Sequence, residues 1–454
     1  MANFDAFERK MTAAGMGDAP IRAFRHNYEA LLRHESGMIP ETSLAPVADL
    51  TSCAHLADTA ADPCLLDRVV IIKLNGGLGT SMGLQGPKCL LPVRDGVNFL
   101  DLMVRQILDL RQRSGSKVRL LLMNSFSTSR DTLHHLARYA GGADILPAAH
   151  HPTAWLADPA EVELLQNQIP KIDAATLAPV TWPADPALEW CPPGHGDLFP
   201  ALVGSGWLDR LLAEGVRYAF VSNGDNLGAT LDTALLNYFA ASEAPFLMEV
   251  TRRTAADRKG GHLARRRSDG RLLLREVAQC PPADLEAFQD IDRHRYFNTN
   301  SLWLRLDLLK TQVAANSGVL PLPMIQNHKT VDPRDQSSPA VIQLETAMGA
   351  AIECFAGATA IEVPRSRFAP VKNTADLLAL RSDAYQILAN GHVQLHPDRH
   401  GVPPVITLSE NYKLVDQLDA LGVPSLLCCR SLTVTGAAHF PPGTVLEGDV
   451  IWNA

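Results

Sequence analysis

The 454-residue chain has no surplus of positive charge. Its 41 Lys and Arg residues stand against 49 Asp and Glu residues, which gives a formal net charge of −8 and a pI of about 6.0. Proteins that bind nucleic acids usually carry a basic balance or a basic stripe, so we expect no nucleic-acid partner. No run reaches the roughly 18 apolar residues of a membrane-spanning helix, and no basic start precedes an apolar stretch at the N-terminus. We therefore expect neither a membrane partner nor a secretory signal.

The chain also lacks the cysteine and histidine patterns of a metal centre. None of its 8 cysteines forms a C-x-x-C pair, which favours reduced, mostly buried thiols and a cytoplasmic location. Histidines recur every four residues from His392 to His400, but Pro397 prevents one continuous helical face, which argues against a zinc site. There is no G-x-S-x-G elbow, and no cysteine has the context of a nucleophile.

Apolar content is ample, with 46% hydrophobic and 20% charged residues, and the length indicates about three domains or subdomains. Short apolar runs alternate with helical patterns. The predicted strands are Arg68–Leu74, Val118–Met123, Tyr218–Ser222, Phe246–Thr251 and Leu272–Val277, and the predicted helices are Phe99–Arg113, Asp131–Tyr139, Leu231–Ala240 and Gln343–Ile352. This alternation predicts an α/β fold with a mixed, mostly parallel sheet, in which ligands bind beyond the carboxyl ends of strands.

The two ends of the chain have different patterns. Phe4, Phe7 and Met11 recur at helical spacing near the N-terminus, while short apolar steps separated by Gly and Pro between 431 and 452 are typical of a parallel β-helix. We therefore expect a helical segment over 1–66, a catalytic core over 67–385 and a C-terminal domain over 386–454.

A glycine-rich loop, Leu74–Gly83, directly follows the first predicted strand. Closely spaced glycines allow positive φ and let backbone N–H groups approach an anion, and Lys88 follows as a cation. The loop is not a dinucleotide fingerprint, because Met82 occupies the third glycine position. It is not a Walker loop either, because Pro87 stands before the lysine. The pattern predicts a phosphate site of another kind.

Two further segments carry chemistry. Glycines on both sides of His195 suggest backbone packed closely on a ligand, with an imidazole that can donate to phosphate. Asp225 follows a predicted strand, where a Mg²⁺ ion that bridges phosphates would bind, since Mg²⁺ takes only one or two protein carboxylates.

The segment Val363–Thr374 carries three cations, Arg365, Arg367 and Lys372, and two prolines. A charge run of this kind is often only a solvated loop. The prolines restrict the backbone, however, and this suits the presentation of cations at a site.

The string Lys73–Gly83, followed by Gly86-Pro87-Lys88, resembles the eukaryotic-type UTP–glucose-1-phosphate uridylyltransferase family of sugar-nucleotide pyrophosphorylases. Glu189–Asp197 matches a further motif of this family, Val221–Gly228 matches another except at Gly224, and the resemblance spans nearly the whole chain. It implies a Rossmann-like, GT-A-like nucleotidyltransferase fold, with a helical N-terminal segment and a short C-terminal left-handed β-helix.

The resemblance also implies roles for individual residues. It assigns nucleotide binding to Leu74, Asn75, Gly76, Gly77, Gly79, Gln166 and Gly194, and sugar-phosphate binding to His195, Asn223, Gly224, Gly260, Glu276 and Asn300. It makes Asp225 the metal ligand and Lys88 and Lys372 the catalytic cations. Gln168 is the alternative to Gln166 for reading the uracil edge.

The implied reaction forms UDP-glucose and pyrophosphate from UTP and glucose 1-phosphate with Mg²⁺, by in-line displacement without a covalent intermediate. Ser81 stands where the hexosamine branch of the superfamily has Arg, which favours glucose. The alternatives are a broader UDP-sugar or UDP-N-acetylhexosamine pyrophosphorylase, and a non-catalytic nucleotide-sugar-binding protein of the same fold. The resemblance also allows a homo-oligomer, although the β-helix, which stops at Ala454, is shorter than is common in the family.

Overall fold

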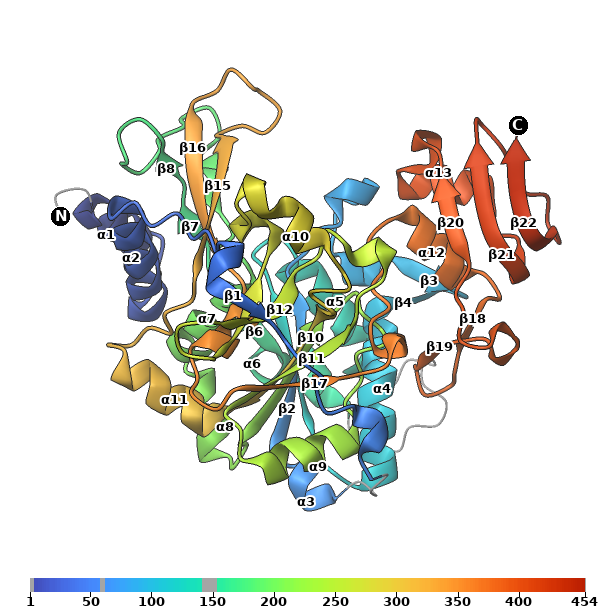
Figure 1. Cartoon of the computed structure of the whole chain (residues 1–454), viewed down its shortest axis with the longest axis horizontal. Helices are drawn as coiled ribbons and strands as arrows, with labels where there is room; N and C mark the ends of the chain where they lie inside the picture. Colours follow the sequence, from blue (N-terminus) through green and yellow to red (C-terminus); the bar gives the residue numbers. More distant parts are fainter. Residues whose placement is uncertain (1–3, 58–61, 141–152, 454) are drawn as a thin grey trace.

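A ten-stranded mixed sheet forms the centre of the computed structural model, which describes residues 4–57, 62–140 and 153–453 (Figure 1). The strands in spatial order are β1 (Leu44–Pro46), β12 (His262–Arg266), β14 (Tyr296–Arg305), β10 (Tyr218–Asn223), β2 (Val69–Asn75), β5 (Arg119–Asn124) and β6 (Glu163–Leu165), with β13 (Leu272–Arg275) beside β12, β11 (Phe246–Arg252) beside β14, and β17 (Thr359–Glu362) beside β11. β10, β2, β5 and β6 pair in parallel, whereas β14 is antiparallel to both β10 and β11. The predicted α/β class and mixed sheet are confirmed.

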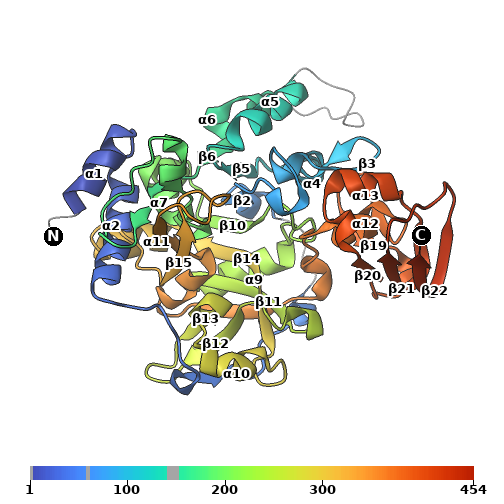
Figure 2. The ribbon, with the colours of Figure 1, turned by 90° about the horizontal axis from the view of Figure 1, so that it is seen from above.

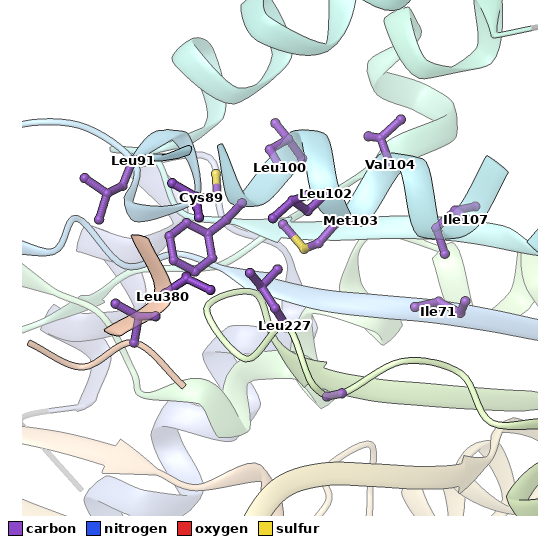
Figure 3. Packing of buried hydrophobic residues seen from close by; sticks show 14 of the residues in the cluster. Ile71, Cys89, Leu91, Leu100, Leu102, Met103, Val104, Ile107, Leu227 and Leu380 are labelled. Carbon is purple, nitrogen blue, oxygen red and sulfur yellow. The ribbon is translucent and has the colours of Figure 1, made fainter. Parts of the chain in front are cut away.

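Helices cover both faces of this sheet. They are α3 (Pro63–Leu66), α4 (Phe99–Ser114), α5 (Ser129–Ala140), α6 (Pro159–Val162), α7 (Leu198–Gly204), α8 (Trp207–Ala213), α9 (Thr233–Ser242), α10 (Leu285–Gln289) and α11 (Leu306–Ala315). Val69 and Ile71 of β2 pack with α4 and α9, whereas Val70 and Ile72 pack with α7, α8 and α11. Figure 3 shows Ile107 of α4 lying over Ile71. The continuous apolar run of β2 is therefore required because both of its faces are buried.

The N-terminal segment forms α1 (Phe4–Ala13) and α2 (Asp18–Leu32), as its periodicity predicts. Phe4, Phe7 and Met11 are buried in a separate small core against Ile342 and Leu344. β1 then joins the main sheet beside β12, so this segment is tied to the catalytic core by backbone pairing as well as by packing.

One predicted helix is wrong. Gln343–Ile352 lies partly in β16 (Ala340–Thr346) and partly in a 3-10 turn, Met348–Glu353. β16 pairs with the preceding strand, β15 (Met324–Thr330), and with the distant β8 (Ile172–Asp173), and this pairing overrides the local periodicity on which the helix was predicted. The remaining short pairs are β7 (Ile169–Pro170) with β9 (Trp190–Cys191), β3 (Pro92–Arg94) with β4 (Val97–Asn98), and β18 (Tyr385–Ile387) with β19 (Val393–Leu395).

The C-terminal part contains α12 (Thr374–Arg381), α13 (Val415–Leu421) and a parallel three-stranded sheet of β20 (Val405–Leu408), β21 (Ser425–Thr435) and β22 (Val445–Asn453). This sheet lies on the opposite side of the molecule from α1 and α2 in both views (Figures 1 and 2). Parallel stacking of the C-terminal apolar steps is confirmed, while a coiled β-helix stays a prediction.

Candidate active site

A cavity of about 260 Å³ lies where four parallel strands end. Register brings the strand ends together: Asn223 pairs with Leu74, Leu74 with Met123, and Asn124 with Leu165. The cavity is lined by Leu74, Asn75, Gly76, Gly77, Lys88, Cys89, Met123, Gln166, Gly194, His195, Asn223, Gly224 and Asp225. The expected location of the site at the carboxyl edge of the sheet is thus met by a cavity that gathers most of the predicted residues.

The glycine loop turns back over the end of β2. Gly79 and Gly83 have φ values of 60° and 78°, in the left-handed region that glycine adopts readily. The backbone N–H of Lys88 donates to Gly77 O at 3.0 Å, which brings the lysine back beside the loop. The side chain of Asn75 is engaged elsewhere, because Nδ2 donates to Asn124 Oδ1 at 2.7 Å. Gly79 supports the turn and is not among the described residues that line the cavity.

A cation and a carboxylate face each other inside the cavity. Lys88 Nζ lies 2.7 Å from Asp225 Oδ2, and the side chains are 17% and 23% exposed. Asp225 lies two residues beyond the end of β10, and its backbone oxygen accepts from the Val371 N–H at 3.3 Å. The residue after Val371 is Lys372, so the segment with the three cations runs beside the cavity.

The three cations of that segment have different environments. Arg365 is itself exposed and pairs with the buried carboxylate of Asp257. Arg367 is buried, and both guanidinium bonds to Glu249 measure 2.8 Å. Lys372 is exposed, with Nζ 5.5 Å from the centre of the Phe368 ring. Two of the three cations therefore hold the segment to the protein through ion pairs, while Lys372 is turned to solvent near the cavity.

Gln166 occupies the position where β6 ends. Its backbone N–H donates to Asn124 O at 2.7 Å, and its Nε2 donates to Gly194 O at 3.0 Å. Gln168 lines the neighbouring cavity, together with Phe126 and Leu165, and is not among the described residues that line this one. The geometry therefore favours Gln166 over Gln168 as the amide that faces the predicted nucleotide site.

The glycines around His195 are required by packing within the protein. Gly194 has φ 79°, and a Cβ there would lie 2.5 Å from Thr346 O. A Cβ at Gly196 would overlap the Thr346 side chain. Thr346 ends β16, so these glycines allow the loop to lie against that strand end. The interpretation from sequence, which assigned them to ligand approach alone, missed this contact because it is non-local.

His195 is held as a neutral imidazole. Its Nδ1 accepts the backbone N–H of Met348 at 3.0 Å, so the proton of the neutral ring belongs on Nε2. Burial lowers the pKa of His195 to about 4. At neutral pH the ring can therefore donate one hydrogen bond to a phosphate without carrying charge.

The low pKa of His195 predicts a pH dependence of stability. Between about pH 4 and 6.5 the unfolded chain binds a proton at this residue and the folded chain does not, so folding is disfavoured as pH falls through this window. We expect wild type to lose stability relative to His195→Gln when pH is lowered from 7 to 5. Urea unfolding of both proteins at the two pH values measures this difference. A constant difference would show that the ring titrates alike in both states.

Three of the predicted sugar residues, Gly260, Glu276 and Asn300, form a second group at the same edge of the sheet. Val221 of β10 pairs with Leu302 of β14, which places Asn300 close to the carboxyl end of β10. Asn300 has φ 56° beside an irregularity in the β11–β14 pairing, and left-handed backbone of this kind concentrates at functional sites. Burial raises the pKa of Glu276, an effect that the Lys372 charge opposes.

Tight packing surrounds this second group. A Cβ at Gly260 would overlap the Phe297 ring, and a Cβ at Gly261 would lie 2.5 Å from Glu276 Oε2. Gly260, Glu276, Asn300 and Lys372 are not among the described residues that line the cavity. Their roles stay predictions.

The sequence interpretation missed two residues that line the cavity, Cys89 and Met123. Burial raises the pKa of the Cys89 thiol to about 12, which keeps it neutral and unreactive. Both residues have a sequence signal that could have identified them: Cys89 follows Lys88, and Met123 is the last residue of a predicted strand.

The other cysteines and the ionisable clusters carry no further centre in the described part of the chain. Cys191, Cys280, Cys354 and Cys429 are buried, while Cys64 and Cys428 are exposed. Within residues 4–57, 62–140 and 153–453, no three His, Cys, Asp or Glu side chains converge as metal ligands. Over the same ranges, none of the helices has the length and apolar character needed to cross a bilayer.

Comparison with known proteins agrees with the geometry of the site. A family model described as UTP–glucose-1-phosphate uridylyltransferase matches residues 21–447. The chain is 41% identical over 419 residues to the UTP–glucose-1-phosphate uridylyltransferase of Solanum tuberosum, covering 91% of this chain and 81% of the relative. It is 42% identical over 389 residues to that of Saccharomyces cerevisiae, covering 85% of this chain and 74% of the relative.

Solved structures show the same likeness. A mutant of the UDP-glucose pyrophosphorylase from Leishmania major, in complex with UDP-glucose, superposes with a TM-score of 0.92 at 47% identity, covering 100% of this chain and 95% of that one. The UDP-glucose phosphorylase from Trypanosoma brucei superposes with a TM-score of 0.88 at 46% identity, covering 100% of this chain and 95% of that one. Since the family model also spans every residue of the cavity, this chain belongs to the UTP–glucose-1-phosphate uridylyltransferase family.

Proposed function

We propose that this protein forms UDP-glucose and pyrophosphate from UTP and glucose 1-phosphate in the cavity at the carboxyl edge of the sheet. The observation that carries the proposal is the gathering, in one cavity, of a glycine loop, an amide, a neutral histidine and the Lys88–Asp225 pair. The glycine loop suits a phosphate chain, and the amide suits the edge of a pyrimidine. The histidine and the Lys88–Asp225 pair suit two reacting anions.

Asp225 fits the divalent metal that we assign to the site. It offers a single partly exposed carboxylate at a strand end, and Mg²⁺ needs only one or two such groups when phosphates and water complete its shell. When bound there, Mg²⁺ would neutralise charge on the phosphate oxygens of the nucleotide. Asp225 is the residue that would hold it, and Lys88 lies against the same carboxylate.

The reaction brings two anions together, so the residues act by positioning and charge. We assign Lys88 to the α-phosphate and the pyrophosphate, and Lys372 to the approaching sugar phosphate. The sugar-phosphate oxygen attacks the α-phosphorus in line as pyrophosphate leaves, and no protein nucleophile is needed. Preorganised charge of this kind is often the largest catalytic contribution. His195 contributes a neutral N–H, so the imidazole can bind phosphate without taking up or losing a proton.

The remaining assignments concern recognition. We infer that Gln166 and Gly194 hold the uracil, and that residues 74–79 hold the nucleotide through their backbone. Asn223 and Gly224 lie in the cavity lining, which supports contact with the sugar phosphate. Gly260, Glu276 and Asn300 complete the sugar site. Glycine at 224 is required by packing within the protein, because a Cβ there would lie 2.9 Å from Leu74 O.

Regional assignments complete the proposal. We assign 1–66 to the helical segment, 67–385 to the nucleotidyltransferase core and 386–454 to a C-terminal domain. We infer that β20, β21 and β22 form a truncated left-handed β-helix, a view that their parallel pairing supports. We place the protein in the cytoplasm, with UTP and glucose 1-phosphate as its small-molecule partners and no nucleic acid or membrane.

A panel of sugar phosphates tests the proposal. We expect release of pyrophosphate from UTP with glucose 1-phosphate, and at least about tenfold lower kcat/KM with N-acetylglucosamine 1-phosphate, since one poorly fitting substituent is worth roughly 1–3 kcal/mol. Galactose 1-phosphate measures the breadth of the sugar site. Equal rates with all three sugars would indicate a broad UDP-sugar pyrophosphorylase, and no release with any of them would leave a non-catalytic binding protein.

A further inference from the structure

Asp197 is a buried carboxylate for which the proposed chemistry gives no role. It ends the turn that begins at His195, and it is only 4% exposed. Its Oδ2 accepts the backbone N–H of Asn167 at 2.7 Å. The Asn167 side chain donates to the same carboxylate, at 3.0 Å to Oδ1 and 3.1 Å to Oδ2. One residue, the neighbour of Gln166, thus supplies three hydrogen bonds to the Asp197 carboxylate.

A second connection links the same two segments. Gln166 Nε2 donates to Gly194 O at 3.0 Å, and the Asp197 N–H approaches the same oxygen at 3.3 Å. Residues 166–167 and 194–197 are thus joined by hydrogen bonds donated from the first segment to both ends of the second. A rotation of Asn167 would shift Gln166, and a shift of the turn would move both Gln166 and His195.

Burial makes this arrangement strongly dependent on its partners. Desolvation raises the pKa of Asp197 to about 7, and the hydrogen bonds from Asn167 oppose that rise. A buried carboxylate that loses its donors is costly, so the Asn167 orientation is tightly specified.

We propose that Asp197 is a positioning residue that sets the orientation of Gln166 through Asn167, and thereby couples selection of the nucleotide base to the loop that carries His195. The inference rests on the proposed function, because it takes uracil as the base that Gln166 faces. Uracil and cytosine present opposite donor and acceptor patterns at positions 3 and 4, so an amide held in one orientation distinguishes them.

The test is an exchange of the two side chains. Asp197→Asn turns an amide N–H₂ toward the donors of Asn167, whereas the double variant Asn167→Asp with Asp197→Asn restores one carboxylate facing one amide. We measure kcat/KM for UTP and for CTP with glucose 1-phosphate in wild type, both single variants and the exchange. We expect the ratio of UTP to CTP to fall about tenfold in Asp197→Asn, as for the loss of a well-aligned buried hydrogen bond, and to return to within about threefold of wild type in the exchange.

A purely structural role would give another result. It would lower kcat/KM for both nucleotides equally, with an unchanged ratio, and this outcome overturns the inference, as does an exchange variant that regains no selectivity. Asp158→Asn is the matched control, because Asp158 caps α6 by accepting the Ala160 N–H at 2.9 Å and Asn caps equally well.

A second variant and a binding measurement complete the test. Should Asp197→Asn not fold, Asn167→Ala carries the same expectation, because it removes only the two side-chain bonds. If wild type released no pyrophosphate with any sugar, the proposed function would fail. Equilibrium binding of UTP and CTP to the same variants would then test the inference alone, with the same expected ratio and the same overturning results.

Discussion

Replacement of Lys88 by alanine is expected to lower kcat by about 10²–10³ while leaving the fold intact, since a preorganised charge at a reacting phosphate is worth this much. The side chain lies in the cavity, 2.7 Å from Asp225, and is partly exposed, so its loss removes charge from the site without opening the core. Steady-state pyrophosphate release measures kcat, and thermal unfolding followed by circular dichroism reports the fold. Lys372→Ala is expected to act in the same direction, through the sugar phosphate.

The matched control removes a lysine–aspartate pair from the surface. Lys310 Nζ lies 2.6 Å from Asp209 Oδ1, with both side chains more than half exposed, so Lys310→Ala should leave kcat unchanged. If the kcat of Lys88→Ala stayed within about threefold of the control, less than about 1 kcal/mol of barrier would depend on Lys88 and the residue would leave the mechanism.

Replacement of Arg367 by methionine is expected to lower the free energy of unfolding by about 3–5 kcal/mol, because it leaves a buried carboxylate without its counter-charge. Glu249 is fully buried, and both of its oxygens accept from the Arg367 guanidinium at 2.8 Å. After the replacement, the Trp303 N–H would remain as a donor to Glu249 at 2.9 Å. Urea denaturation of the two proteins at pH 7 measures the difference.

An ion pair made by Arg252, which lies on β11 as Glu249 does, provides the comparison. Arg252 Nε lies 2.9 Å from Glu362 Oε1, and the Arg252 side chain is 56% exposed, so Arg252→Met should cost less than about 1 kcal/mol. Equal losses in the two variants would contradict a special role for burial. The Arg367 backbone oxygen accepts from Asn226 Nδ2 at 3.1 Å, next to Asp225. Loss of the ion pair releases this segment and so displaces Asn226 and its neighbour Asp225, and the Arg367 variant should therefore also raise KM for glucose 1-phosphate.

Local patterns predicted the parts of the fold that depend on local physics. The apolar run of β2 is continuous because both its faces are buried, and the spacing of Phe4, Phe7 and Met11 matches one buried helical face. The helix predicted over Gln343–Ile352 is wrong, because pairing with β15 and β8 decides that segment, and such pairing is invisible to local periodicity. The position of β14, antiparallel between β10 and β11, is likewise a property of the whole sheet.

The sequence alone determined the class of the site. A glycine loop after a buried strand, a lysine soon after it and an aspartate at another strand end identify a phosphate-handling cavity, because parallel strands bring their carboxyl ends to one edge. The roles of individual residues became visible only in the folded structure. Two of the three neighbouring cations hold a loop through ion pairs, the glycines beside His195 let that loop pack against β16, and Asp197 accepts hydrogen bonds from Asn167. These contacts join residues that are far apart in the chain and meet only after folding. Burial then requires each polar group among them to find a hydrogen-bond partner.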